Sequence, residues 1–301
     1  MDLLPDVEFI TVDKRAGLGA LPALRRALHG RRFDVLLHLQ LSLRASLLST
    51  AIRARVRLGF DRERAREGQW LFTNARIQPR KREHVLDSFL GFLWALGVDP
   101  GPLQWDLPLP DDAVRYAAEL IPDDQPTLVI SPCSSHAARN WSAERYAAVA
   151  DHAARAWRMR IILCGGPTPL ERETSAAIDR QTRAQIINQT GRDTLPQMLA
   201  LLSRASVLMC PDSGPAHMAT MVGTPVIGLY AATRSARSGP YRSLQWCVDR
   251  YEAAARRFRH RSASELPWAE KIEEPGVMDL IEVAEVRERL DSLMASQQLL
   301  P

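Results

Sequence analysis

Short apolar runs alternate with stretches of helical periodicity between residues 126 and 232, and this alternation most limits what the chain can fold into. Apolar residues spaced three or four apart mark the helical stretches, whereas the runs between them are short and rich in strand-forming residues. Strict alternation of strand and helix favours a parallel, doubly wound α/β sheet. The predicted strands lie within 126–135, 160–166, 185–191, 207–214 and 225–232.

A second alternation precedes this one. Its predicted strands are 7–12, 33–40 and 56–60, and its predicted helices are 20–30, 43–55 and 83–97. Prolines gather around 98–112, which is therefore the best linker candidate. A chain of 301 residues exceeds one typical compact domain, so we expect two. The predicted division is an N-terminal domain over 1–112, a C-terminal ligand-binding domain over 113–284, and a terminal helix over 285–301 that can pack back on the N-terminal domain.

The charge of the chain argues against nucleic acid as a partner. The formal net charge is +4 over 301 residues, and basic residues do not interleave with aromatic ones. Arginine far outnumbers lysine, which occurs only at positions 14, 81 and 271. Arginine-rich surfaces suit phosphate and other anionic partners, although a genome rich in GC would produce the same bias.

Four cysteines stand far apart, at positions 133, 164, 210 and 247, and none forms a C-x-x-C pair. This spacing predicts reduced, buried thiols and no disulfide framework. The histidines show no metal-binding spacing, no apolar run is long enough to span a membrane, and the N-terminus does not resemble a signal peptide. We therefore expect a cytoplasmic protein without metal or cofactor, and peripheral contact with a membrane surface through arginines stays open.

Residues 211–241 place an acid, a hydroxyl, a histidine and several glycines directly after a buried strand. Asp212, Ser213 and Gly214 are predicted to lie at the carboxyl end of that strand and at the start of a helix, where open α/β sheets bind ligands. A helix N-terminus presents free N–H groups that suit phosphate, and Gly214 lets the backbone approach a ligand closely. His217 follows one turn later. The alternatives are helix capping for the first two residues and a packed histidine for the last.

Three further loops follow predicted strands at the same sheet edge. In 131–141, hydroxyls and a forked arginine cation suit a diphosphate, and the alternative is a serine-turn loop with a solvated arginine. In 164–173, paired glycines resemble a nucleotide-approach turn, and an acid there could accept from ribose hydroxyls or simply start a helix. The residues concerned are Ser134, Ser135 and Arg139 in the first loop, Glu171 or Glu173 in the second, and Thr233, Ser238 and Gly239 in 233–240.

The segment PDSGPAHMATMVGTPVIGLY (211–230) resembles the hallmark of glycosyltransferase family 9, the ADP-heptose:lipopolysaccharide heptosyltransferases. That hallmark is an acid, a serine or threonine, Gly-Pro, a histidine two residues on, and Gly-x-Pro before a strand. SPCSSHAARNWSAERYAAVA (131–150) resembles the donor-phosphate loop of the family and the helix after it. GGPTPLERE (165–173) and TRSARSGPY (233–241) match in order and spacing. The likeness is good over 126–245 and looser in the N-terminal domain.

This resemblance implies a GT-B fold, in which two Rossmann-like, doubly wound domains face a cleft. The second domain would bind ADP-heptose, and the first would bind a lipid A–Kdo inner-core acceptor at the cytoplasmic face of the inner membrane. The implied chemistry is an inverting, metal-independent transfer in which an acceptor hydroxyl attacks the anomeric carbon and ADP leaves. The resemblance places phosphate contacts at Arg139, Ser134 and Ser135, and the positions that close around diphosphate and sugar at Asp212, Ser213, Gly214 and His217.

The sequence departs from the pattern of the family at two points. Relatives begin with a strand and a Gly-Asp loop whose aspartate is the proposed general base. No such loop is found here, so the first βα unit is expected to be absent, the catalytic base unknown, and transfer slower by roughly 10²–10⁴-fold. Asp6 and Asp13 do not substitute, because neither follows a strand in a Gly-Asp turn. Pro169 stands where relatives often carry an acid, which weakens the expected ribose contact.

On the acceptor side, Gln40 and Arg44 follow a predicted strand and are expected to face the cleft. Arg62, Arg64 and Arg66 form a basic cluster that could meet phosphorylated sugars, and the alternative is a solvated charged loop. Two other functions stay open. One is a nucleotide-sugar-binding remnant without turnover, and the other is a different GT-B enzyme, such as an epimerase, that acts on a UDP-sugar.

Overall fold

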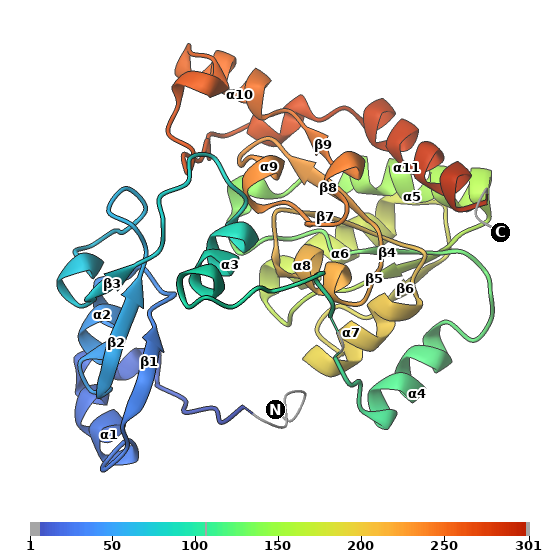
Figure 1. Cartoon of the computed structure of the whole chain (residues 1–301). Helices are drawn as coiled ribbons and strands as arrows, with labels where there is room; N and C mark the ends of the chain where they lie inside the picture. The colour runs from blue at the N-terminus through green and yellow to red at the C-terminus, as the bar shows by residue number, and fades with distance from the viewer. Residues whose placement is uncertain (1–6, 106, 299–301) are drawn as a thin grey trace. The chain divides into compact units, whose positions relative to one another are not determined.

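The computed structural model describes residues 7–105 and 107–298. The chain forms two compact units that divide between Gln104 and Trp105, and each unit contains one sheet of parallel strands (Figure 1). The predicted α/β class is confirmed. The division falls inside the proline-rich segment 98–112, whereas the predicted domain limits at 112 and 284 stay predictions.

The N-terminal unit is built around three parallel strands in the order β1-β2-β3. Its elements are η1 (Lys14–Gly19), α1 (Ala20–Ala27), β1 (Phe33–Leu37), α2 (Leu43–Ser49), β2 (Ala54–Gly59), η2 (Gln69–Leu71), β3 (Ala75–Arg76) and α3 (Val85–Ala95). Leu58, Phe60, Ile77 and Phe92 are the large residues of its small core. Gly97 follows α3 with a φ of 74°, a left-handed conformation in which glycine ends helices without a steric cost.

The strand predicted at 7–12 is wrong. The described residues of this segment form no strand, and Val7, Phe9 and Ile10 are 49%, 46% and 37% exposed. Apolar alternation becomes a strand only where a neighbour accepts the backbone hydrogen bonds and a core covers the apolar face. Asp6 lies outside the described residues.

The C-terminal unit contains six parallel strands in the order β6-β5-β4-β7-β8-β9. They are β4 (Thr127–Ile130), β5 (Arg160–Leu163), β6 (Ile186–Asn188), β7 (Val207–Pro211), β8 (Val226–Tyr230) and β9 (Val248–Asp249). All the strands expected from the sequence are present, and the two-residue β9 is additional. The chain runs outward from β4 through β5 to β6, and then returns to β7 on the other side of β4. Open α/β sheets bind ligands at such a reversal, beyond the carboxyl ends of the strands.

Helices cover both faces of this sheet (Figure 1). They are α4 (Asp111–Leu120), α5 (Ala143–Trp157), α6 (Pro169–Gln181), α7 (Leu195–Arg204), α8 (Gly214–Met221), α9 (Ser235–Ser238), α10 (Tyr251–Arg259) and α11 (Val283–Gln298), with 3₁₀ turns η3 (Ala137–Arg139), η4 (Leu244–Trp246), η5 (Ala263–Glu265) and η6 (Val277–Leu280). Leu128 and Ile130 of β4 pack with α5 and α11, whereas Val129 packs with α7 and α8. Successive side chains of a strand point to opposite faces, and burial of both faces explains why these runs are apolar throughout.

Helix starts in this unit follow the sequence closely. Ser142, the predicted N-cap of α5, accepts a hydrogen bond from the backbone N–H of Arg145 at 3.4 Å. Pro169 occupies the first position of α6, where its missing N–H costs nothing. The sequence does not predict α4, because its buried face consists of Ala113 and Ala117, which give a weak hydrophobic signal.

The last helix, α11, packs against α5 within the C-terminal unit (Figure 1). Asp291 of α11 accepts a hydrogen bond from Nε1 of Trp157 at 2.6 Å and lies 2.7 Å from Nε2 of His152. The expected packing of the terminal helix on the N-terminal domain stays a prediction. Among the described residues, no helix combines the length and the apolar character needed to cross a membrane. The four cysteines are free and buried, as predicted.

Asp193, in the loop before α7, holds a buried carboxylate oxygen. Its Oδ2 has no hydrogen-bond partner in the described part of the chain, and burial raises the pKa of Asp193 to about 6. The folded chain therefore holds this proton more tightly than the unfolded chain, in which an aspartate titrates near pH 4. Ionisation of Asp193 consequently lowers the free energy of unfolding as the pH rises from about 4 to above 6.

We expect Asp193→Asn to stabilise the C-terminal unit at pH 8 and to lose most of that gain at pH 4.5. Because Asp193 is only partly buried, solvent screening limits the gain at pH 8 to about 1 kcal/mol, or roughly 2–4 °C in Tm. Calorimetric melting of wild type and variant at both pH values measures the difference. An equal shift at both values would mean that the charge is not its cause.

Candidate functional site

A pocket of about 500 Å³ opens at the carboxyl ends of β4, β5 and β7, where the strand order reverses. The loops after these strands and the first turns of α7 and α8 line it. The lining residues are Ser131, Cys133, Ser134, Ser135, Arg139, Gly165, Gly166, Glu171, Leu195, Met198, Asp212, Ser213, Gly214, Pro215, His217 and Met218. Eight of the nine donor-side residues predicted from the sequence are in this set. The ninth, Thr233, is buried and does not line the pocket.

Arg139 is the only arginine or lysine among the described residues that line the pocket. Its Nε and Nη2 donate to Oε1 of Glu273 at 2.9 and 2.7 Å, and its Nη1 lies 3.5 Å from Oδ2 of Asp212. Arg139 is only 8% exposed, so the solvated alternative does not hold. Burial by itself would raise the pKa of Glu273, but the hydrogen bond and charge of Arg139 outweigh it and hold that pKa below its ordinary value. The guanidinium is thus fixed by carboxylates at one wall of the pocket.

The N-terminus of α8 enters the same pocket. Ser213 is the N-cap residue, with φ −152° and ψ 167°, but its side chain makes no capping bond within the described chain. Its hydroxyl lies 3.2 Å from the carbonyl oxygen of Pro211 and donates to it instead. The capping alternative is therefore wrong for Ser213. A Cβ built on Gly214 would meet no atom within 4 Å. Pro215 has no N–H, and the N–H of Ala216 donates to the carbonyl oxygen of Ser213 at 3.2 Å. Among the first three residues of α8, the N–H of Gly214 is therefore left for water or a ligand.

His217 lies one turn into α8. Burial lowers the pKa of His217, and the nearby Asp212 carboxylate only partly opposes this. The imidazole is therefore neutral at pH 7, and it can donate one hydrogen bond and accept another. A neutral ring can contact a phosphate or a sugar hydroxyl, although it adds no positive charge to the pocket.

Glu171 organises the glycine loop between β5 and α6. Its Oε1 accepts from the backbone N–H of Gly166 at 2.8 Å, and its Oε2 accepts from Oγ1 of Thr168 at 2.6 Å. These bonds are typical of an acid in the first turn of a helix. They agree with the alternative prediction that Glu171 simply starts α6. The carboxylate also lines the pocket, so its remaining lone pairs are available to a ligand there.

The loop after β4 carries the two serines. Ser134 is buried, and its backbone N–H donates to Oδ1 of Asn140 at 2.6 Å. Ser135 is exposed at the pocket. Asn140 therefore fixes the loop that presents both hydroxyls.

The sequence did not single out several residues that build this site. Glu273 holds Arg139 from 134 positions away, and nothing in its local sequence signals that contact. Leu195, Met198 and Met218 add apolar surface to the pocket, and helical periodicity alone assigns such residues to a core. Asn140 has a local signal, since asparagine side chains commonly fix loops.

The acceptor-side candidates belong to the N-terminal unit. Gln40 is exposed beyond β1, and Arg44 is exposed in the first turn of α2. Arg62 and Arg66 are also exposed, whereas Arg64 is held by ion pairs with two carboxylates. The basic cluster is thus solvated at two of its three positions.

The sequence model of glycosyltransferase family 9 (heptosyltransferase) matches residues 21–268, which is most of the chain. The chain belongs to glycosyltransferase family 9. One relative of the chain is the lipopolysaccharide core heptosyltransferase OpsX of Haemophilus influenzae, which is 39% identical over 283 residues. That alignment covers 94% of this chain and 81% of the relative. The family expected from the hallmark segment is confirmed.

Two solved structures share the fold of this family 9 chain. A family 9 glycosyltransferase from Veillonella parvula matches with a TM-score of 0.75 at 21% identity, over 96% of this chain and 83% of that one. The heptosyltransferase WaaC of Escherichia coli, solved with ADP, matches with a TM-score of 0.66 at 18% identity, over 91% and 77%. The expected GT-B fold is confirmed. In the described part of this chain, no group of three or more His, Cys, Asp or Glu side chains could hold a metal ion.

Proposed function

We propose that this family 9 chain transfers a heptose from ADP-heptose to an inner-core lipopolysaccharide acceptor, with inversion and without a metal ion. The observation that carries the proposal is the pocket in which the fixed cation Arg139 and the uncapped start of α8 meet. Two names support the choice of substrates. OpsX is named a lipopolysaccharide core heptosyltransferase, and WaaC was solved with ADP.

The diphosphate of the donor would lie between Arg139 and the first turn of α8. A forked guanidinium and a free N–H at a helix start are strong donors to phosphate oxygens. Ser134 and Ser135 would add hydroxyl contacts, and Ser213 and Gly214 would frame the helix end. Asp212 and the neutral His217 lie at the same end of the pocket, where we assign them to the sugar and its phosphate.

The nucleoside would occupy the other side of the pocket. Leu195, Met198 and Met218 offer apolar surface to a purine, and Leu195 is 61% exposed. Glu171 would accept from ribose hydroxyls with the lone pairs that its own loop leaves unused. Thr233 stays a predicted donor contact.

In the proposed reaction an acceptor hydroxyl attacks the anomeric carbon while the bond from that carbon to the β-phosphate oxygen breaks. A general base accepts the hydroxyl proton, and we assign this role to none of the donor-side residues. Negative charge builds on the departing diphosphate, so donors already aimed at it stabilise the transition state more than the ground state. Arg139 and the free N–H of Gly214 are suitably placed for this role.

On the acceptor side, we assign Gln40 and Arg44 to contacts with the inner-core saccharide. The N-terminal unit holds 17 arginines and lysines against 11 aspartates and glutamates, whereas the C-terminal unit holds 22 against 24. A basic acceptor unit suits a phosphorylated glycolipid at an anionic membrane surface. We place the reaction at the cytoplasmic face of the inner membrane.

Calorimetric titration with ADP and with UDP tests the donor assignment, and a transfer assay with ADP-heptose tests turnover. We expect ADP to bind at least about tenfold more tightly than UDP, since a purine covers more of the apolar wall. Equal binding of UDP would favour an enzyme that acts on UDP-sugars. Selective ADP binding without transfer would identify a binding remnant.

A further inference from the structure

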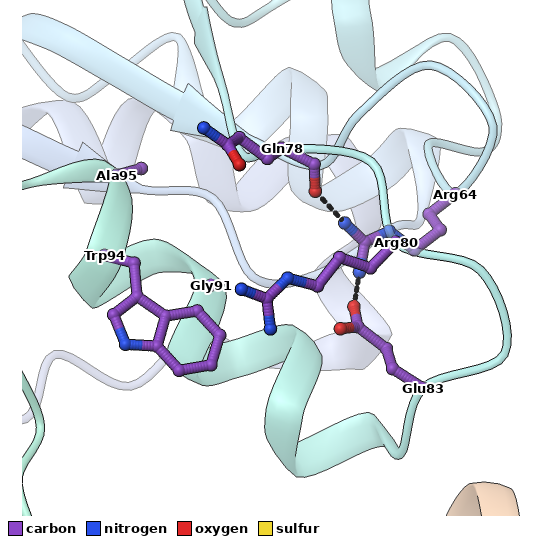
Figure 2. A pocket seen from close by; sticks show the side chains of 7 residues that line it. All are labelled: Arg64, Gln78, Arg80, Glu83, Gly91, Trp94 and Ala95. Atoms are coloured by element: carbon purple, nitrogen blue, oxygen red, sulfur yellow. Dashed lines mark hydrogen bonds and ion pairs between the residues drawn. The ribbon is translucent and has the colours of Figure 1, made fainter.

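A second, smaller pocket lies in the N-terminal unit, between the segment after β3 and the outer face of α3 (Figure 2). Its volume is about 90 Å³, room for roughly three water molecules. A phosphate or a carboxylate group fits such a space, whereas a whole sugar ring does not. The lining residues are Arg64, Gln78, Arg80, Glu83, Gly91, Trp94 and Ala95.

Arg64 forms a closed wall of this pocket. Its guanidinium pairs with the carboxylates of Asp61 and Glu83, and its Nη2 donates to the carbonyl oxygen of Gln78 at 2.7 Å. With all three of its nitrogens engaged, Arg64 ties three segments together and neutralises negative charge at the pocket. It is therefore a structural residue here.

Arg80 lines the same pocket but is not held by carboxylates as Arg64 is. It is exposed, and among the described residues it has no hydrogen-bond or ion-pair partner. Its guanidinium carbon lies 4.3 Å from the ring centroid of Trp94, and Figure 2 shows it turned toward that ring. A cation resting on an indole keeps its N–H donors available at its edge. Arg80 is thus the available cation of this pocket.

Trp94 is 40% exposed, so one large aromatic surface stands at the pocket mouth. Gly91, one turn earlier on α3, also lines the pocket, and a Cβ there would approach Cδ1 of Ile77 at 3.4 Å. Aromatic and arginine side chains are the usual anchors of binding surfaces, and here one of each stands at the same pocket.

We propose that this pocket binds an anionic substituent of the acceptor saccharide, a phosphate or a carboxylate held by Arg80, with the sugar ring packed against the exposed part of the Trp94 indole that the guanidinium leaves uncovered. The chemistry follows from the residues: a forked cation for the anion, a small cavity to enclose it, and an aromatic face for the ring that carries it. The identification of the bound sugar as the acceptor rests on the proposed function. Recognition of an anionic sugar rests on the pocket alone.

The test is an NMR titration of the full chain, observed at the indole Nε1–H of Trp94, whose signal is assigned by its loss in Trp94→Phe. The probes are glucose 6-phosphate, glucuronate, inorganic phosphate and neutral glucose. We expect the signal to shift and saturate with the sugar phosphate or the sugar acid, and the tighter of the two identifies the anion. Arg80→Gln should weaken this binding about tenfold or more, as expected for a charge-assisted contact.

Arg76→Gln is the matched control, because Arg76 is an exposed arginine of the same unit that does not line the pocket. Glucose that binds as tightly as the charged sugars would overturn the role of Arg80. Inorganic phosphate that binds as tightly as glucose 6-phosphate would overturn the role of Trp94. If the charged sugars bind at Trp94 but ADP does not bind the chain, the proposed donor function is wrong and the proposal of this sugar site holds. If ADP binds but no sugar shifts the Trp94 signal, the proposal of this sugar site is wrong and the donor function is unaffected.

Discussion

Replacing Arg139 with glutamine is expected to weaken ADP binding by about 10- to 150-fold. The guanidinium is the fixed cation of the donor pocket, and a charge-assisted contact to phosphate is worth about 1.5–3 kcal/mol. The loss in kcat/KM should be larger, about 10²–10³-fold, because the charge on the leaving diphosphate grows in the transition state. Calorimetry with ADP measures the first effect, and the transfer assay measures the second.

The control must separate this role from a structural one, since Arg139 also holds Glu273 and Asp212. Arg160→Gln serves that purpose. Arg160 has a similarly buried side chain, 13% exposed against 10%, and it pairs with Asp123 at 2.8 Å outside the pocket. Equal losses of ADP affinity in the two variants, or unchanged affinity in Arg139→Gln, would contradict the assignment of the diphosphate.

The convergence of the donor-side loops could be predicted because it follows from topology. Parallel strands in strict alternation with helices bring all their carboxyl ends to one edge of the sheet. Loops after β4, β5 and β7 must then meet, however far apart Arg139 and Asp212 lie in the sequence. The side-chain types in those loops predict phosphate, and the pocket contains them together.

Contacts that depend on tertiary packing could not be predicted in this way. Glu273 reaches Arg139 only because the chain after α10 returns to the pocket, and no local pattern records that return. The segment 7–12 has the composition of a strand, but strand formation depends on a partner that the segment itself does not specify. The sequence does not distinguish Arg64 from Arg80, yet in the structure Arg64 pairs with two carboxylates and Arg80 rests on an indole.

Replacing Gly214 with leucine is expected to abolish detectable ADP binding, a loss of at least about 100-fold, while the fold stays intact. Gly214 is the first residue of α8 and lines the pocket, and a Cβ there would meet no protein atom within 4 Å. A leucine side chain would therefore occupy ligand space beside the free N–H of residue 214. Because Pro215 follows, any side chain at position 214 is disfavoured in the helical conformation, so Gly214→Ala and Gly214→Leu should both lower Tm by a similar, modest amount.

Gly19→Leu is the matched control, because Gly19 also has an ordinary backbone conformation and open space at its Cβ but lies in the N-terminal unit. Calorimetry with ADP and thermal melting of both variants give the answer together. Gly214→Ala should fall between wild type and leucine, since a methyl group blocks less of the pocket. If Gly214→Leu bound ADP as wild type does, the diphosphate could not lie at the start of α8, and Arg139 would have to hold it from another side. Loss of ADP binding in Gly214→Leu, at a Tm no lower than that of Gly214→Ala, would instead place the leaving group against the free N–H of Gly214.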